Sequence, residues 1–461
     1  MLRNFFTFLF LLCFSVLKAQ NIQKIEDVFP VKWKTYIGQT TYRSNILLHQ
    51  NKIWVGSNGN TLERNANDEN DAVFALDTKT GNVLAKIQPI GKPNDTETPD
   101  FDVNGIAIEG TKLFFGTDYK VLYCYDIDKK EFLWQYSTPT DAVGGNYGNI
   151  ESCPLLADLN GDGESDVVIT VRGKGVVAVN GKTGKPIWVN ILSQAEGAFL
   201  TSPCSVDVNK DNVPDIITGG WGTEYESYLY ALDGKNGKIL WQFRLGSGLK
   251  SSPSIIHKGK KTAILVASTY SIVYMVDLKG QPLYAVNLNM PEQAPFFGGI
   301  SGLFASPILT PNETLGIGSA WWSDKQDGFW VTHLQKATLN EEKGLKVVDR
   351  SLSNFTSANR ISASAVVAQV NNKNWQLIVP TEKGRLLLYD EKKKTMQTFQ
   401  LPAGSETTPF IGDIDGDRKL ELLLATYDGY LYCYQLPLKK AKVFVGQFRQ
   451  DNKNQATIRL K

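Results

Sequence analysis

Short apolar runs separated by polar turns follow one another along most of the chain. In residues 202–245 these runs read SPCSVDV, DIITGG, YLYALD and ILWQFRL, divided by an acidic loop, a glycine-rich loop and the turn Gly234–Gly237. Runs of this length rich in Val, Ile, Leu, Tyr and Trp, with Gly, Asn and Asp between them, are typical of antiparallel sheets. The pattern therefore predicts four short strands in this stretch.

The same pattern recurs, and the residue that opens its first strand can be aligned in eight copies. The copies lie about 52 residues apart on average, and five have proline at this place, where a strand loses no ladder hydrogen bond. Such a repeated four-stranded sheet buries both faces only against its neighbours, which predicts an all-β fold, a β-propeller of four-stranded antiparallel blades. The opening residues are Asn45, Gly105, Pro154, Pro203, Pro253, Pro307, Ala365 and Pro409.

We expect eight blades, with seven as the alternative, because the sixth copy is poorly patterned and ends in LKVVDRSL (345–352). Trp134, Trp188 and Trp241 mark the fourth strand of three copies. Trp33 has similar surroundings but no three strands before it, so we expect it to close the ring against the last copy; AKVFVGQF (441–448) is the alternative. The predicted divisions are a signal peptide 1–19, a linker 20–32, one propeller domain 33–448 and a C-terminal tail 449–461.

The first residues, MLRNFFTFLFLLCFSVLKAQ, have the composition of a secretory signal peptide. Arg3 precedes an apolar core from Phe5 to Leu17, and Ala19 stands before a polar stretch. No later segment is apolar over the roughly 18 residues that a membrane helix needs. We therefore expect an exported protein, periplasmic, at the cell surface or secreted, without an integral membrane span.

Charge and cysteine content exclude several other classes. The formal net charge is +2 over 461 residues, which gives no electrostatic footprint for nucleic acid. Four cysteines follow the signal peptide, too few for a disulfide scaffold of this length, and we expect them to be free, buried thiols. The three histidines fall in unrelated places of the repeat, which gives little support to a zinc centre or a Ser-His-Asp triad.

Three copies carry a series of oxygen ligands between the first and second strands. Oxygen side chains at positions 1, 3, 5 and 9 of a loop are typical of calcium sites, and position 6 needs a left-handed backbone. Gly163 and Asn212 adopt this conformation readily and Arg418 less so, which weakens the third site. We expect Ca²⁺ as a structural ion. The ligands are Asp158, Asn160, Asp162 and Asp166; Asp207, Asn209, Asp211 and Asp215; Asp413, Asp415, Asp417 and Glu421.

Blade geometry sorts the loops onto two faces. Loops between strands one and two and between strands three and four emerge on one face, and this face holds the acidic loops. The long insertions emerge on the other face, which we take as the binding face because recognition residues concentrate on variable loops over a rigid scaffold. The candidate residues for a protein or glycan ligand are Tyr147, Trp221, Tyr225, Phe296, Phe297, Trp321 and Trp322, with carboxylates that include Asp68 and Asp71 beside them.

Two families resemble these repeats. VFALDTKTGNVLAKI, VVAVNGKTGKPIWVN and LYALDGKNGKILWQF resemble PQQ-like propeller repeats, in which an Asp/Asn-x-x-Thr/Asn-Gly turn leads to a docking tryptophan. PLLADLNGDGESDVVIT, PCSVDVNKDNVPDIITG and PFIGDIDGDRKLELLLA resemble the calcium-binding FG-GAP repeats of integrin α-chains. The resemblance extends from Trp33 to Phe448. Exported proteins of this kind include quinoprotein alcohol dehydrogenases and a non-enzymatic outer-membrane assembly factor.

The resemblance implies a propeller scaffold more than an activity. The dehydrogenases carry a vicinal cysteine pair over their cofactor, and this sequence has neither a Cys-Cys pair nor a Cys-x-x-Cys-His motif. We therefore do not expect PQQ, and we expect a non-enzymatic binding or assembly scaffold stabilised by calcium. The alternative is an enzyme with its site at the propeller mouth, either a PQQ-dependent dehydrogenase or a glycan-degrading protein.

Overall fold

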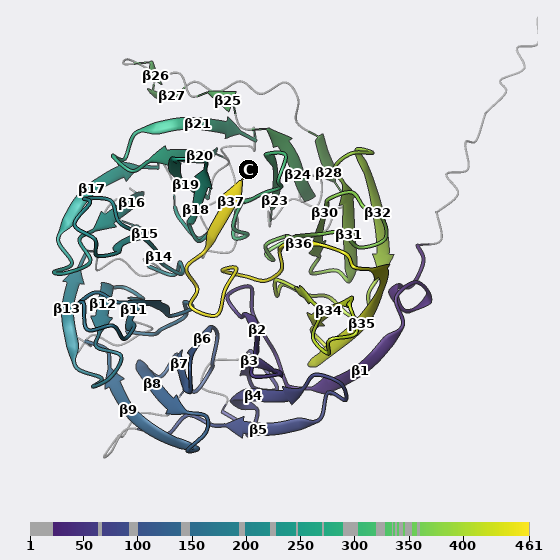
Figure 1. Cartoon of the computed structure of the whole chain (residues 1–461), viewed down its shortest axis with the longest axis horizontal. Helices are drawn as coiled ribbons and strands as arrows, with labels where there is room; N and C mark the ends of the chain where they lie inside the picture. Colours follow the sequence, from purple (N-terminus) through teal and green to yellow (C-terminus); the bar gives the residue numbers. More distant parts are fainter. Residues whose placement is uncertain are drawn as a thin grey trace, which may run out of the picture.

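The computed structural model describes residues 22–62, 67–91, 100–139, 148–192, 199–221, 227–245, 248–269, 272–288, 303–319, 328–333, 335–336, 339–340, 344–345, 353–356 and 360–460. These residues form eight antiparallel sheets arranged as a ring around one axis (Figure 1). The prediction of an eight-bladed β-propeller is confirmed, and the seven-bladed alternative is wrong.

The first four blades each have four strands in sequence order. Blade 1 is β2 (Ile46–His49), β3 (Lys52–Asn58), β4 (Asp71–Asp77) and β5 (Val83–Ile87), and blade 2 is β6 (Ile106–Glu109), β7 (Lys112–Gly116), β8 (Val121–Asp126) and β9 (Glu131–Ser137). Blade 3 is β10 (Leu155–Ala157), β11 (Asp166–Val171), β12 (Gly175–Val179) and β13 (Pro186–Ile191), and blade 4 is β14 (Cys204–Val206), β15 (Asp215–Trp221), β16 (Ser227–Leu232) and β17 (Ile239–Arg244).

The last four blades include strands from both ends of the chain. Blade 5 is β18 (Ser254–Lys258), β19 (Lys261–Ala267), β20 (Ile272–Asp277) and β21 (Pro282–Asn287), flanked by β37 (Thr457–Leu460) and β25 (Gln335–Lys336); blade 6 is β22 (Ile308–Leu309), β23 (Thr314–Gly318), β24 (Gly328–His333) and β28 (Ser353–Thr356). Blade 7 is β29 (Val366–Ala368), β30 (Gln376–Pro380), β31 (Arg385–Asp390) and β32 (Thr395–Gln400), flanked by β36 (Val443–Val445); blade 8 is β33 (Phe410–Gly412), β34 (Lys419–Ala425), β35 (Tyr430–Lys439) and β1 (Val31–Tyr36). A separate pair consists of β26 (Leu339–Asn340) and β27 (Gly344–Leu345), and η1 (Ile25–Asp27) is a 3-10 helix.

Every aligned opening residue lies directly before the first strand of its blade, and the Ser/Thr-Pro pairs have a structural reason. The hydroxyl that precedes the opening residue accepts a backbone N–H from the equivalent place in the preceding blade, which links neighbouring blades around the axis. The proline that follows needs no partner, because it has no N–H. The bonds run from the N–H of Cys153 to Ser202 (2.9 Å), Ser202 to Ser252 (2.9 Å), Ser252 to Ser306 (3.0 Å), Ser306 to Ser364 (2.9 Å) and Ser364 to Thr408 (3.0 Å).

Strand β1 closes the ring, as the sequence predicts. It pairs antiparallel with β35, and Trp33 lies opposite Cys433. The alternative closure by residues 441–448 is wrong, because β36 from that stretch pairs with β29 on the inner edge of blade 7. The assignment of LKVVDRSL as the fourth strand of blade 6 is also wrong, since β24 pairs with β28, which begins just after it.

Tryptophans of the outer strands dock onto the turn between the third and fourth strands of the next blade. The ring of Trp188 covers Gly237, whose φ of +72° tolerates no side chain easily, and a Cβ there would lie 2.5 Å from the ring. The four indole N–H groups donate to turn carbonyls: Trp33 to Thr78 (3.0 Å), Trp134 to Gly181 (3.2 Å), Trp188 to Gly234 (2.8 Å) and Trp241 to Leu278 (2.8 Å). These docks confirm the predicted turn-and-tryptophan pattern.

Residues 443–460, which we call the axial segment, run through the centre of the ring (yellow in Figure 1). The segment begins in β36 on blade 7 and ends in β37, which pairs parallel with β18 of blade 5. Between them, the Arg449 guanidinium donates to the carbonyls of Pro203 and Pro253 at 2.6 and 2.8 Å. The Asn454 amide donates to Ile106 and Pro154 at 2.8 and 2.7 Å. The inner strands of several blades are thus bound to one another through the axis.

The core consists of several apolar clusters, each shared between neighbouring blades. Ile25 and Phe29, which precede β1, are fully buried between blades 7 and 8. The largest apolar cluster spans blades 5 to 7 and includes Val445, Ile458 and Leu460 of the axial segment. Within the described part of the chain, no helix is long and apolar enough to cross a membrane.

Candidate functional site

The three acidic loops have the same backbone. The carboxylate at position 1 accepts two N–H groups, from positions 4 and 6: Asp158 accepts from Gly161 (2.7 Å) and Gly163 (3.0 Å). Asp207 and Asp413 repeat these bonds with their own loops. Position 6 has positive φ in all three, including Arg418 at +68°. Arginine therefore accommodates the left-handed backbone that position 6 requires.

The carboxylate at position 9 is buried beneath each loop. Asp166 and Asp215 are at most 1% exposed, and each accepts an N–H of its loop, from Leu159 at 3.0 Å and from Val208 at 2.8 Å. Burial raises the pKa of Asp166 to about 6. Blade 7 has Gln376 at this place, and its amide oxygen accepts the N–H of Val370 at 2.9 Å. Position 9 therefore supports the loop backbone even where it is uncharged.

The loop of blade 8 brings its acidic groups closest together. Among the described residues, Asp413, Asp415 and Glu421 are the one group of three acidic side chains whose ligand oxygens all lie within 4.8 Å of one another. The ammonium of Lys32, from the ring-closing strand, lies 2.5 Å from Asp415 and 3.2 Å from Glu421. A cationic side chain of the protein therefore already contacts this group.

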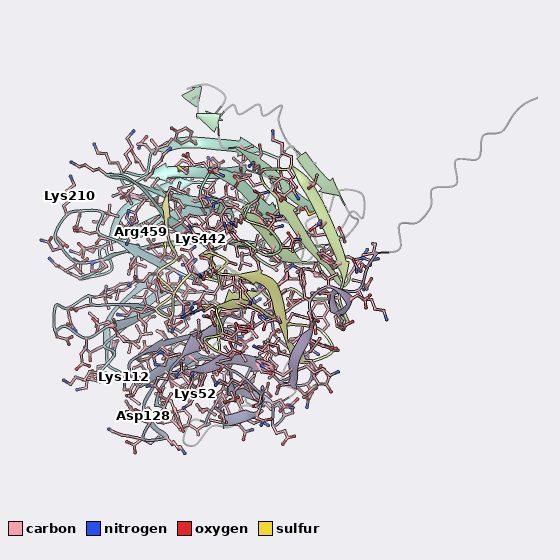
Figure 2. The ribbon with its side chains drawn as sticks, turned by 45° about the vertical axis from the view of Figure 1, so that its right-hand side comes forward. Lys52, Lys112, Asp128, Lys210, Lys442 and Arg459 are labelled. Carbon is pink, nitrogen blue, oxygen red and sulfur yellow. The ribbon has the colours of Figure 1, made fainter. Side chains whose placement is uncertain are left out.

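Figure 2 labels residues of the face that carries these loops, which we call the turn face. Lys52 and Lys112 begin second strands, Lys210 lies between the first and second strands of blade 4, and Asp128 lies between the third and fourth strands of blade 2. The opposite face, formed by loops between strands two and three and between blades, is called the insertion face. Of its predicted ligand residues, Tyr147, Tyr225, Phe296, Phe297, Trp321 and Trp322 lie outside the described residues, and Trp221 ends β15 with its side chain not described.

The rim of the axis on the insertion face contains paired, buried charges that the sequence analysis missed. Both carboxylate oxygens of Glu151 are bound, one by Arg43 and one by Arg172, each at 2.6 Å. Despite burial, the two arginines hold the pKa of Glu151 below its usual value. The guanidinium of Arg43 also lies over the ring of Tyr42, 4.5 Å from its centre. This arrangement fixes the three charged side chains against one another.

Further charged groups lie near Arg43, Arg172 and Glu151. The ammonium of Lys250 lies 4.6 Å from the ring centre of Phe304, and burial lowers its pKa to about 8, with Arg43 adding repulsion. Burial and the neighbouring Glu382 raise the pKa of Glu406 to about 7, although Arg43 and Arg360 lie close to it. Glu382 itself pairs with Arg360 at 3.4 Å, so acidic and basic side chains alternate around the mouth.

A second acidic set lies on the insertion face between blades 1 and 2. Asn58 donates to Asp102 at 3.1 Å, and the carboxyl groups of Asp71 and Asp102 are hydrogen-bonded to each other. Burial raises the pKa of Asp71 to about 6 and that of Asp102 to about 8. Asp118 of blade 2 accepts from Asn104 at 3.4 Å, and burial raises its pKa as well.

The repeat alignment contained a signal for these residues. Many mouth residues stand three places before an opening residue, where the chain enters a blade on the insertion face. This column precedes the first strand of each blade, so the pattern of apolar runs that predicts the strands does not include it. The residues of the column are Tyr42, Asp102, Glu151, Leu200, Lys250, Phe304, Ser362 and Glu406.

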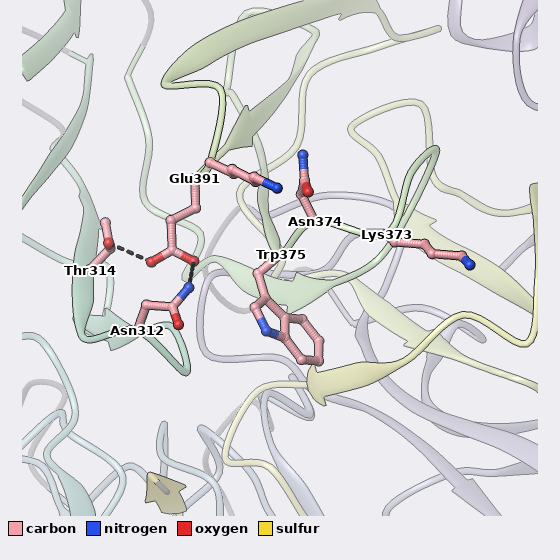
Figure 3. Close-up of a pocket in the computed structure, with 7 residues that line it drawn as sticks. Asn312, Thr314, Lys373, Asn374, Trp375 and Glu391 are labelled. Carbon is pink, nitrogen blue, oxygen red and sulfur yellow. Dashed lines mark hydrogen bonds between the residues drawn. The ribbon is translucent and has the colours of Figure 1, made fainter.

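The turn face has a groove of about 380 Å³ between blades 6 and 7, and among the described residues no indole N–H bonds across this junction. Figure 3 shows Glu391 directed toward Thr314 and Asn312, which donate to its carboxylate at 2.6 and 2.9 Å. Trp375 lines the groove and packs its ring 5.9 Å from that of Phe444. Because Glu391 is bound by side chains of blade 6, the groove includes a contact that joins two blades.

The described cysteines are buried and free, as predicted: Cys124, Cys153, Cys204 and Cys433. Burial raises the pKa of the Cys153 thiol to about 12, and its sulfur lies 3.2 Å from the carbonyl of Arg43. A thiol with this pKa is neutral at physiological pH and is a poor nucleophile.

Comparison with known proteins agrees with this architecture. An FG-GAP-like repeat model matches residues 158–218, which contain the first two acidic loops and not the third. Over 279 residues the chain is 23% identical to the outer membrane protein assembly factor BamB of Yersinia pestis; the match covers 50% of this chain and 66% of that protein. The chain therefore matches a little under two thirds of that relative's length.

Solved structures show the same fold. BamB from Moraxella catarrhalis superposes with a TM-score of 0.53 at 11% identity, covering 89% of this chain and 100% of that one. A quinohemoprotein alcohol dehydrogenase from Pseudomonas putida HK5 gives 0.55 at 14% identity, covering 88% and 76%. A europium-containing methanol dehydrogenase gives 0.57 at 12% identity, covering 88% and 93%. The chain is a β-propeller that is similar in fold to BamB and the quinoprotein dehydrogenases, and it contains a stretch that matches an FG-GAP-like repeat.

Proposed function

We propose that this protein is an exported, non-enzymatic scaffold that binds a protein or a glycan through its insertion face. The observation that carries the proposal is the construction of the mouth. The axial segment binds the inner strands together at the axis, and Glu151 uses both carboxylate oxygens to hold Arg43 and Arg172. Charges that bind one another make a rigid support for loops. Proton transfer would instead need a group free to exchange its proton with a substrate.

The relative with the matching sequence supports a protein partner. Its name assigns it to outer membrane protein assembly, and an assembly role suits a propeller whose insertions extend from one face. Under this proposal the protein acts in the periplasm, at the cell surface or after secretion. The residues predicted to contact the partner remain Tyr147, Trp221, Tyr225, Phe296, Phe297, Trp321 and Trp322.

Partner capture tests this function. A glycan array and a pull-down with the purified chain should give one reproducible ligand, and Trp321→Ala with Trp322→Ala should weaken its binding at least about tenfold, as expected for aromatic anchors. The matched control is Lys52→Ala on the opposite face, which should leave binding unchanged. Empty results in both assays would contradict the scaffold proposal.

Calcium is the proposed structural ion of the first two acidic loops. Their donors are oxygens, which suit a hard cation, and the FG-GAP-like match contains both loops. Chelation should lower the melting temperature, and Asp158→Ala with Asp162→Ala should remove much of that shift. Equal melting curves with and without chelator would contradict the proposal. Blade 8 differs because Lys32 lies on its carboxylates.

The alternative of a quinone enzyme finds little support in the described residues. The arginines of the mouth are held by Glu151, and the sequence has no adjacent cysteine pair. These residues do not fit the quinone site that the resemblance implies. Incubation with PQQ and Ca²⁺, followed by a dye-linked alcohol oxidation assay, should give no bound chromophore and no turnover; either signal would favour the enzyme.

A further inference from the structure

Buried oxygens without a hydrogen-bond donor lie at the junction of blades 1 and 2. Asn58 and Asp71 are opposite each other in the register of β3 and β4, and they are 3% and 1% exposed. The Oδ1 atoms of both side chains are buried and have no partner. A buried acceptor without a donor costs about 1–3 kcal/mol. A group that accepts lone pairs from both oxygens would offset this cost.

The charge around these oxygens is acidic. The carboxyl group of Asp102 is hydrogen-bonded to that of Asp71 and also accepts from Asn58 at 3.1 Å. Asp68 and Asp118 lie beside the pair. Within the described part of the chain, neither Asp71 nor Asp102 has an ion-pair partner. A water molecule would satisfy the orphaned oxygens, and a proton shared between Asp71 and Asp102 would relieve the repulsion between them; a divalent cation would do both at once.

We propose that Asn58, Asp71 and Asp102 bind a divalent cation of the hard, oxygen-preferring class, of which Ca²⁺ is the representative. Two carboxylates and an amide oxygen are the ligand types that such ions take from proteins. Gly59 leaves space beside them, because a Cβ there would lie 2.7 Å from Asp71 Oδ1 and 2.8 Å from Asp68 Oδ2. Asp68 lies next to the site, and its two carboxylate oxygens accept the backbone N–H groups of Asn60 and Asn70.

The site is independent of the acidic loops. It lies on the insertion face, whereas the loops lie on the turn face, and its donors belong to blade 1 and to the entry of blade 2. No tryptophan docks between these two blades among the described residues. A cation that joins Asp71 to Asp102 would therefore fasten a seam that lacks the indole contact present at the neighbouring seams.

Counting bound calcium tests the proposal. Equilibrium dialysis of the full chain should show one equivalent fewer in Asp71→Asn with Asp102→Asn than in the unchanged protein. The Asp158→Ala, Asp207→Ala variant should retain that equivalent, so a failure of the loop proposal is distinguishable from a failure here. Equal equivalents in the unchanged protein and the Asp71→Asn, Asp102→Asn variant would overturn the proposal.

A gain-of-function variant covers the case in which the double variant does not fold. Asn58→Asp adds a third carboxylate to the site, and its calcium Kd should fall at least tenfold while the loop sites are unaffected. An unchanged affinity would overturn the proposal. Mg²⁺ should bind more weakly than Ca²⁺, because Mg²⁺ demands a near-octahedral shell and retains its waters.

Discussion

Neighbouring blades are joined in two different ways in the two halves of the ring. Docked tryptophans join blade 8 to 1, 2 to 3, 3 to 4 and 4 to 5. Around blades 5 to 7, no such dock is present among the described residues, and the axial segment adds β37 to blade 5 and β36 to blade 7. The comparison shows that the docked half is fastened at its outer turns and also at the axis, through Arg449 and Asn454, whereas the other half gains added strands in place of docks.

The groove between blades 6 and 7 shows what replaces a tryptophan. Glu391 stands in the turn that an indole covers at the docked seams, and it accepts hydrogen bonds from Thr310 and Thr314, each at 2.6 Å. These bonds are directional but cover little apolar surface. Apolar burial contributes about 25 cal/mol per Å², so a partly buried polar contact of this kind is the weaker joint.

Deletion of residues 443–460 should have the largest effect. It removes two strands and the buried side chains of Val445, Ile458 and Leu460. Each such side chain contributes about 1.5–3 kcal/mol, so the loss approaches the roughly 5–15 kcal/mol stability of a whole domain. We expect no cooperative melting transition by circular dichroism. A transition within a few degrees of that of the unchanged protein would show that the axis does not hold this half together.

Removal of one docked tryptophan should come next. Trp188→Ala leaves a cavity over Gly237 and should lower the free energy of unfolding by about 3–5 kcal/mol, measured by urea denaturation. Trp375→Ala in the open groove is the matched control, and we expect about 1 kcal/mol because its ring is only partly buried. Equal losses of unfolding free energy in the two variants would show that a docked tryptophan stabilises its blade junction no more than the residues of the groove stabilise theirs.

The seam between blades 7 and 8 should respond to pH. Burial and Glu382 raise the pKa of Glu406 to about 7, so the folded protein binds more protons than the unfolded chain between about pH 4.5 and 7. The free energy of unfolding should therefore fall by roughly 2–3 kcal/mol as pH rises through this window. Glu406→Gln should flatten this part of the stability profile, and an unaltered profile would exclude Glu406 as its source.

The ring-closing strand should show the smallest effect on stability. Lys32→Met removes the ammonium from Asp415 and Glu421, and we expect a loss of about 1 kcal/mol, as for other partly exposed ion pairs. The same change should allow the blade 8 loop to bind one further equivalent of Ca²⁺. The conservative Lys32→Arg keeps the charge and should not gain that ion; a gain in both variants would contradict the role of the lysine charge.

The sequence predicted the parts of the fold that repeat. The eight strand entries, the tryptophan docks and the closing role of Trp33 follow from local patterns that recur, because each copy must make the same contacts with its neighbours. The prediction of the fourth strand of blade 6 was wrong, because the strand at 353–356 has no such pattern. The part of the axial segment after residue 448 was predicted as a tail, because its partners are carbonyls of distant blades and no local pattern indicates them.

Sequence and structure also disagree on the acidic loops for a physical reason. The sequence predicted that Arg418 would weaken the third calcium site, because arginine disfavours a left-handed backbone. Its backbone is as left-handed as those of Gly163 and Asn212, and the loop differs instead through Lys32, which is far away in sequence. The sequence of one loop does not indicate which side chains from distant strands contact it.

The pairing of β1 with β35 has a consequence for the order in which the protein is made. Lys32 contacts Asp415 across 383 positions of chain, so the first strand to be synthesised waits for nearly all the others before it has a partner. The axial segment comes later still. Neither the pairing of β1 with β35 nor the contacts of the axial segment can form in a partial chain. Until they form, the unpaired strand edges are exposed and can pair with other chains.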